Sequence, residues 1–189
     1  MTWTIDTAHT TVGFSAKHLG VSTVRGVFRT FEGDINLPDD GDLTKGHGRV
    51  VVQVGSIDTG NEQRDGHLRN ADFFDVENHP TLTFEAKSVT RDGDRYRVVG
   101  DLTIKGVTRE VSLDLEDAAV VEDPFGNTKV GGTLTGTINR SDWGLKWNVP
   151  LGGGGLLVSD RIKIEVDAEL AKDKEAVAEE VAQEAGSVA

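Results

Sequence analysis

The chain of 189 residues contains no cysteine, which excludes disulfides, thiolate chemistry and cysteine-bearing zinc sites. Long apolar runs are also missing, because the longest near-apolar stretch, VPLGGGGLLV, is too short and too rich in glycine to span a bilayer. The first ten residues, MTWTIDTAHT, have neither the basic region nor the apolar region of a secretory signal. Together these absences predict a soluble, cytoplasmic protein without membrane insertion.

Positive charge is scarce. The sequence has 20 lysines and arginines against 32 aspartates and glutamates, and its formal net charge is -12 at pH 7. An excess of negative charge is not typical of general nucleic-acid binders or of proteins that adhere to anionic lipid surfaces. We therefore expect neither kind of partner.

The dominant pattern in the sequence is period-two alternation of apolar and polar residues, which is typical of antiparallel strands with one dry and one wet face. It occurs in the segments TVGFSAKH, TVRGVFRTF, GRVVVQV, TLTFEAK, RYRVVGDLTI, REVSLDLE, KVGGTLTGTIN and RIKIEVDAEL. Turn signals such as LPDDGD at 37–42, RDGD at 91–94 and EDPFGN at 122–127 lie between them. About eight strands joined by short turns predict an all-β protein, either a closed up-and-down barrel or a sandwich.

Small residues occupy several positions on the apolar faces. They are Ala16, Gly26, Ala86, Gly100, Gly132 and Gly136. In an eight-stranded barrel, small inward residues leave room for one elongated apolar ligand. Inward glycines can equally relieve crowding where strands bend, without any cavity. The spacing favours neither reading over the other.

The stretch RDGHLRNADFFDVENHPTLTF, residues 64–84, interrupts the alternation. We expect a helix over residues 61–72 that crosses one barrel end, with Leu68, Phe73 and Phe74 turned inward to close that end or to line a cavity. The turn into the next strand then falls at residues 79–80.

Two charged residues open this stretch. Arg64 and Asp65 are expected to form an ion pair with each other or to cap the helix, whose first turn favours carboxylates. A second turn is expected at residues 140–147, where Trp143 either plugs one barrel end or borders a cavity.

No standard catalytic or metal motif is present. The sequence contains no H-E-x-x-H metal motif, no P-loop and no strand-to-helix G-x-G-x-x-G. We expect no catalytic residue and no metal ligand. Two alternatives remain open: a redox protein that uses the histidines through haem or a quinone, and an interaction module with a filled barrel. The five histidines are His9, His18, His47, His67 and His79.

The residues closely resemble those of the YceI family of polyisoprenoid-binding, lipocalin-like proteins. The resemblance covers about residues 3–170 and rests on the spacing of His9, Phe14 and His18, the run RD-x-HL…DFF…P-x-x-F, and LTI-x-GVT. It divides the chain into a barrel domain at residues 1–170 and an Ala- and Glu-rich tail at residues 171–189, expected to be disordered or a frayed helix.

The resemblance implies an eight-stranded antiparallel lipocalin-like barrel whose apolar cavity holds a polyprenyl chain or an isoprenoid quinone, with no other cofactor. It implies a bacterial, non-enzymatic carrier, storage or sequestering protein. Dimers are common in the family, so a homodimer is also expected, and many relatives are periplasmic. Family motif residues and inward positions together give the expected ligand-binding residues: Phe14, Ala16, His18, Phe28, Leu68, Phe73, Phe74, Phe84, Leu102, Leu134 and Trp143.

Overall fold

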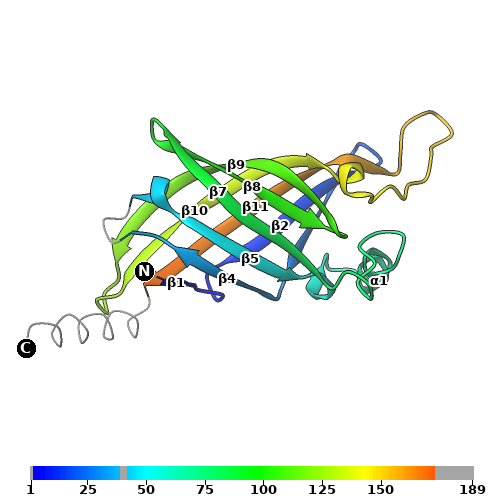
Figure 1. Ribbon diagram of the computed structural model, residues 1–189. Coiled ribbons are helices and arrows are strands. Elements are labelled where there is room, and N and C mark those ends of the chain that lie inside the picture. Colours follow the sequence, from blue (N-terminus) through cyan, green and yellow to red (C-terminus); the bar gives the residue numbers. More distant parts are fainter. Residues whose placement is uncertain (1, 39–41, 173–189) are drawn as a thin grey trace, which may run out of the picture.

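The computed structural model describes residues 2–38 and 42–172, which form an antiparallel β-barrel (Figure 1). The strands are β1 (Thr2–Ile5), β2 (Thr11–His18), β3 (Ser22–Phe28), β4 (Phe31–Asn36), β5 (His47–Gln53), β6 (Ile57–Asp58), β7 (Thr81–Asp92), β8 (Arg95–Ile104), β9 (Val107–Glu122), β10 (Thr128–Asn139) and β11 (Val158–Lys172). The helices are η1 (Leu43–Lys45), η2 (Val54–Ser56), α1 (Glu62–Arg69) and η3 (Arg140–Trp143).

The strand segments make eight barrel strands, because β1 and β2, β3 and β4, and β5 and β6 each continue one interrupted strand. β2 pairs with β11 from Thr11 to His18, and β1 pairs with the last residues of the same strand. Each strand neighbours the next in sequence, and β1 closes the ring against β11. The expected all-β, eight-stranded antiparallel barrel is confirmed, and the sandwich alternative is excluded. Closure leaves no long free edge for another chain to pair with.

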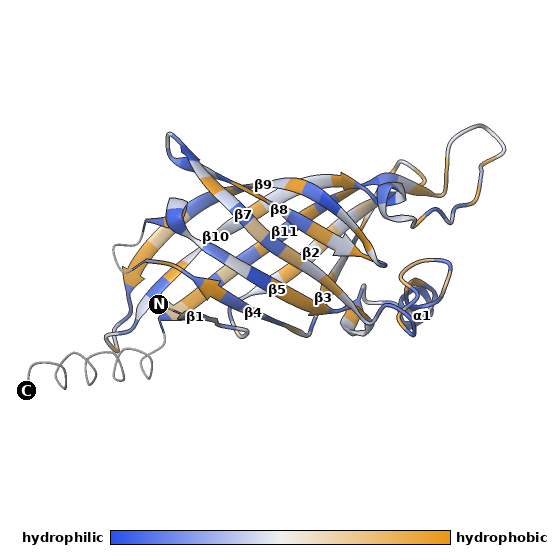
Figure 2. Ribbon diagram, viewed as in Figure 1, coloured by the Kyte–Doolittle hydropathy of each residue, from blue (hydrophilic) through white to orange (hydrophobic). Residues whose placement is uncertain are grey.

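The alternation seen in the sequence sets the two faces of the wall. In Figure 2 apolar and polar residues alternate along the strands. Residues paired across neighbouring strands share a face, as Leu134 does with Val166, and Phe84 with Leu102. Ion pairs link neighbouring strands on the outer face, for example Arg97 of β8 with Asp114 of β9 at 3.1 Å.

The helix between strands is shorter than the sequence predicts. Asn61 caps α1 by accepting a hydrogen bond from the Arg64 backbone N–H at 2.9 Å. α1 ends at Arg69 rather than at residue 72, because Asn70 is extended and its carbonyl oxygen accepts the backbone N–H of Phe73 at 3.1 Å. This exit from the helix turns the following residues back towards the barrel. β7 begins directly after residues 79–80, where the turn was expected.

The two ends of the barrel differ. α1 and η3 lie at one end, and the amino terminus and the end of β11 lie at the other (Figure 1). At the α1 end, aromatic and aliphatic side chains pack around Phe73, Trp143 and Phe28. At the opposite end a smaller cluster forms around Trp3, Leu37 and Val130.

The barrel domain continues slightly beyond its expected boundary at residue 170. β11 runs to Lys172, where it still pairs with Trp3 of β1. The tail expected at residues 171–189 otherwise lies outside the described residues. Among the described residues, no helix has the length and apolar content that crossing a membrane requires.

Candidate ligand cavity

The barrel encloses an apolar cavity of about 200 Å³. Its lining reaches from the middle of the barrel to the end where the chain begins, and all eight strands contribute to it. Thr10 and His47 are the polar side chains of this lining, as far as the structure describes it. The lining residues are Ile5, Thr10, Val12, Phe31, Ile35, Leu37, Leu43, Gly46, His47, Gly48, Val50, Phe84, Ala86, Val89, Val98, Leu115, Val130, Gly131, Gly132, Leu134, Val166, Ala168 and Leu170.

Small residues in neighbouring strands make room for this cavity. Gly48 of β5 pairs with Ala86 of β7, and Gly132 of β10 pairs with Ala168 of β11. All four line the cavity. The Ile35 side chain lies over Gly48 and the Leu115 side chain lies over Gly132, so these two glycines relieve crowding. Ala86 and Ala168 carry only a methyl group, which leaves space that larger residues would fill. At this end the cavity reading therefore applies to the alanines rather than to the glycines.

Three further inward glycines also serve close packing. The Phe14 ring lies over Gly26, the Phe84 ring lies over Gly100, and the Leu113 side chain lies over Gly136. A β-carbon at any of these glycines would collide with the side chain above it. Crowding relief therefore explains these three positions.

The α1 end of the barrel is filled by a plug of aromatic side chains. Trp143 is 3% exposed, and its indole nitrogen donates a hydrogen bond to the carbonyl oxygen of Leu102 at 3.0 Å. The ring centres of Phe73 and Trp147 lie 5.3 Å apart, and the His67 ring meets both edge-on. These contacts close the end of the barrel away from the cavity.

Adjacent Phe73 and Phe74 enter different parts of this plug. Phe73 packs with His67 and Trp147, whereas Phe74 meets Phe28 edge-on at 6.0 Å. Phe73 is buried in one apolar cluster, and Phe74 packs against that cluster and against the one around Phe28.

Arg64 and Asp65 do not pair with each other, contrary to expectation. Both bind Thr59, the residue that precedes the α1 cap by two positions. Asp65 is 6% exposed and accepts hydrogen bonds from the Thr59 backbone N–H and hydroxyl, while Arg64 donates to the Thr59 hydroxyl at 2.7 Å and to its carbonyl at 2.8 Å. The helix cap is Asn61. Arg64 and Asp65 therefore both hold the turn into α1 through Thr59, and we assign them no catalytic role.

Two of the expected ligand-binding residues, Phe84 and Leu134, line the cavity. Ala16 borders a groove on the outer surface, and His18 ends β2, half-buried, opposite Ser22. The other expected residues belong to the packed clusters at the α1 end. They are Phe14, Phe28, Leu68, Phe73, Phe74, Leu102 and Trp143. Contact of any of the eleven with a ligand stays a prediction.

Most of the lining was not singled out from the sequence. Val50, Val98, Val130 and Val166 sit in the inward phase of the alternating segments, so the pattern marked their face. Alternation shows which residues face inward, but it does not show how far each lies from either end of the barrel. The sequence therefore could not separate cavity residues from those that fill the α1 end.

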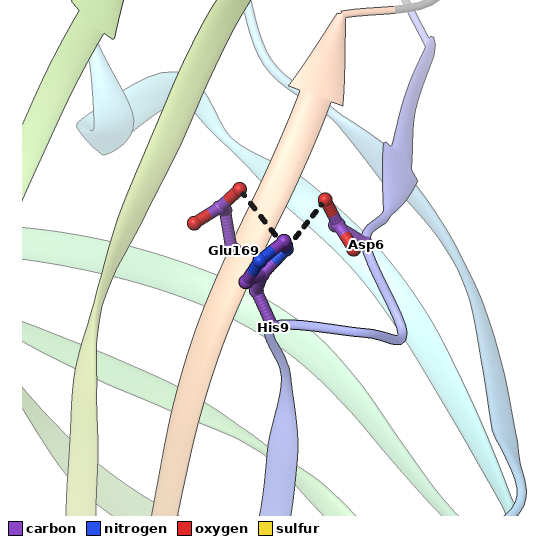
Figure 3. Close-up of side chains that lie close together, drawn as sticks. All are labelled: Asp6, His9 and Glu169. Carbon is purple, nitrogen blue, oxygen red and sulfur yellow. Dashed lines mark hydrogen bonds and ion pairs between the residues drawn. The ribbon is translucent and has the colours of Figure 1, made fainter. Parts of the chain in front are cut away.

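A cluster of charged side chains ties the strands together near this cavity (Figure 3). Asp6 accepts from His9 at 3.0 Å, and Glu169 lies 3.8 Å from the same ring nitrogen. Lys129 donates to Asp6 at 2.8 Å and to Glu169 at 3.0 Å. The Lys129 ammonium, with His9, holds the pKa of Asp6 far below its usual range.

Asp6, His9 and Glu169 form a group of three potential metal ligands among the described residues. Lys129 already supplies a positive charge between the two carboxylates. The cluster is therefore explained as a clamp between the β1–β2 connection and strands β10 and β11. Other described histidines have separate surroundings: His47 lines the cavity and His67 binds Asp72 at 3.1 Å.

Comparison with known proteins agrees with the barrel. Residues 3–170 match the YceI-like domain. A protein of Staphylococcus aureus strain N315, named as a UPF0312 protein, is 41% identical over 172 residues, covering 88% of this chain and 95% of the relative.

Solved structures also share the fold. The Campylobacter jejuni YceI protein superposes with a TM-score of 0.69 at 28% identity, over 84% of this chain and 90% of its own. A polyisoprenoid-binding domain from Saccharophagus degradans superposes with a TM-score of 0.64 at 16% identity, over 90% of this chain and 98% of its own.

Proposed function

The chain belongs to the YceI-like family, and from that premise we propose that its cavity binds the apolar chain of a polyisoprenoid lipid, either a polyprenyl chain or an isoprenoid quinone. The protein would act as a carrier, store or sequestering protein rather than as an enzyme, without a further cofactor. The observation that carries the proposal is the composition of the lining, in which apolar residues from all eight strands surround the space and two polar side chains interrupt it.

The energetics of burial suit a prenyl chain. Transfer of each CH₂ group from water to an apolar environment yields about 0.8 kcal/mol, so each five-carbon isoprene unit contributes a few kcal/mol. A prenyl chain therefore needs no charged anchor in order to bind. The binding domain from Saccharophagus degradans supports the same ligand class. In this proposal Thr10 and His47 meet the polar head, because they offer the polar atoms of the lining.

Organic extraction of the purified protein, followed by mass spectrometry, tests the proposal. We expect a prenyl-type lipid in the extract. Replacing Ala168 by Phe should remove it, because Ala168 lines the cavity and the ring would project into that space. Thr135→Phe adds a ring to the outer face of β10, opposite Glu165, and serves as the matched control.

The two variants introduce the same aromatic ring on opposite faces of the barrel wall and give opposite expectations. Ala168→Phe should lose both extracted lipid and binding of an added polyprenol or quinone, while Thr135→Phe keeps both. Extracts free of lipid, together with no binding of added polyprenols or quinones, would overturn the proposal, and so would full binding by Ala168→Phe.

A further inference from the structure

The outer face of the barrel carries a groove lined by four cations. Pairing across strands places Lys163 of β11 beside Ser15 of β2, which in turn pairs with Arg25 of β3. Arg161 and Lys17 lie two residues along the same strands and on the same face. The groove is lined by Ser15, Ala16, Lys17, Thr23, Arg25, Thr137, Ser159, Arg161 and Lys163, so no carboxylate lines it.

Most of these cations lack the carboxylate partner that several others on the barrel wall have. Lys87 binds Asp101 at 2.7 Å and Arg95 binds Glu116 at 3.3 Å, whereas Arg91 and Arg109 donate to backbone carbonyls. Lys163 binds Glu165, which lies outside the groove lining, at 2.6 Å, and the charge of Arg25 also acts on this carboxylate. Across the described residues, Lys17, Arg25 and Arg161 lie within ion-pair distance of no carboxylate. Lys17 instead donates to the Thr23 hydroxyl at 2.8 Å.

The same strands end in an exposed apolar tip. The turn between β2 and β3 carries Leu19, which is 43% exposed, and Val21, which is 81% exposed. Leu19 has a positive φ of 54°, in the left-handed region that is uncommon for residues other than glycine. The Leu19 backbone N–H donates to the carbonyl oxygen of Leu157 at 2.8 Å, which joins the glycine-rich loop at residues 149–157 to this tip. The loop adds two exposed apolar side chains, Val149 and Leu156.

We propose that this end of the barrel docks on an anionic lipid bilayer, with the tip in the interfacial layer and the cationic groove facing the phospholipid head groups. At about 3.3 Å per residue, Lys17 lies ~7 Å from Leu19 along β2, and Arg25 lies ~13 Å from Val21 along β3. Apolar side chains buried about 5–10 Å at the boundary between head groups and acyl chains would bring both cations to the level of the phosphates.

The net charge of -12 does not oppose this docking. Charges more than about 10 Å apart are screened at physiological salt, so a bilayer responds to the local patch rather than to the total. An anionic bilayer is therefore a possible partner of this surface, although the net charge alone predicts no binding to anionic lipids. The apolar tip favours a bilayer over a nucleic acid, whose phosphate backbone offers leucine and valine nothing to bury against.

Flotation with lipid vesicles tests the docking surface. The full-length protein should bind vesicles of phosphatidylcholine and phosphatidylglycerol, bind phosphatidylcholine alone more weakly, and lose binding as salt rises. Each cation near an anionic surface contributes a factor of about five in partitioning. The Arg25→Gln/Arg161→Gln variant should therefore bind about thirtyfold more weakly. Val21→Ser/Leu156→Ser should weaken binding to both vesicle types.

Arg95→Gln/Arg97→Gln removes the same charge from the outer face of β8, outside the groove, and should leave vesicle binding nearly unchanged. Equal binding to both vesicle types, equal losses in the two arginine variants, or no binding at low salt would overturn the inference. So would stronger, groove-dependent binding to a single-stranded oligonucleotide. Polyprenol binding is measured on the same variants and should not change, which separates this surface from the proposed cavity function.

Discussion

Trp143 donates its indole N–H to the carbonyl oxygen of Leu102 at 3.0 Å, across 41 positions of sequence. This bond anchors η3 to the inner wall at β8. Because Leu102 also pairs with Arg109 of β9, the indole adds a second donor to a strand carbonyl inside a closed barrel end.

We predict that Trp143→Phe destabilises the fold by about 2–4 kcal/mol, because it removes packed volume and the buried indole hydrogen bond. Urea unfolding measures the change. Trp3→Phe is the control: Trp3 is equally buried at 3% exposed, but its indole nitrogen has no hydrogen-bond partner among the described residues. Trp3→Phe should therefore lower the free energy of unfolding by about 1 kcal/mol less than Trp143→Phe does. Equal costs would contradict the role given to the bond.

The cluster around Lys129 predicts a dependence on pH. The pKa of Asp6 is lowered from its ordinary value of 3.8, mainly by the hydrogen bond from Lys129 and then by that from His9. A lowered folded pKa contributes stability above the unfolded pKa, and that stability is lost as pH falls towards the folded pKa. Asp6→Asn should therefore be less stable than the parent chain at neutral pH, and the difference should shrink below about pH 4.

Unfolding in urea at a series of pH values checks this expectation. Glu77→Gln, in an exposed turn, is the control and should track the parent chain. A gap between Asp6→Asn and the parent that stays constant down to pH 2–3 (about one unit or more below an ordinary aspartate) would contradict it.

The side chains packed over inward glycines predict that adding a methyl group at such a glycine destabilises the fold. Gly26→Ala places a methyl group against the Phe14 ring, so we expect a loss of about 1–3 kcal/mol in unfolding free energy. A second change, Phe14→Leu, should recover part of that loss. Gly66→Ala in α1 is the control, because nothing lies near its β-carbon position and alanine favours helix by about 1 kcal/mol. A neutral Gly26→Ala would show that the ring moves aside freely.

The sequence predicted the barrel well because period-two alternation is a local signal. Val12 and Phe28 share the dry face in their own segments, and the structure pairs them directly. The position of α1 followed from the break in alternation, although its end did not, since Asn70 leaves the helical conformation to satisfy local backbone bonds.

The candidate site was less predictable, because its place along the barrel depends on pairing between distant strands. The conspicuous motif residues Phe73 and Trp143 fill the α1 end, whereas the cavity is lined by unremarkable positions such as Ile35 and Leu170. The register of β1 with β11 places Ile5 beside Leu170 at that space, although the two residues are far apart in the sequence.

The interruptions between β1 and β2, β3 and β4, and β5 and β6 fall on three adjacent barrel strands. Strands β7 to β11 run without such interruptions, although their ladders carry bulges at Ala86/Ser88 and Gly131/Thr133. The β1–β2 connection is held to β10 and β11 by Lys129, which binds Asp6 and Glu169. Local opening of the wall is therefore expected first at the β3–β4 and β5–β6 interruptions, where backbone pairing stops without such a clamp. Phe31 follows the β3–β4 interruption and lines the cavity, so the wall opens first beside that space.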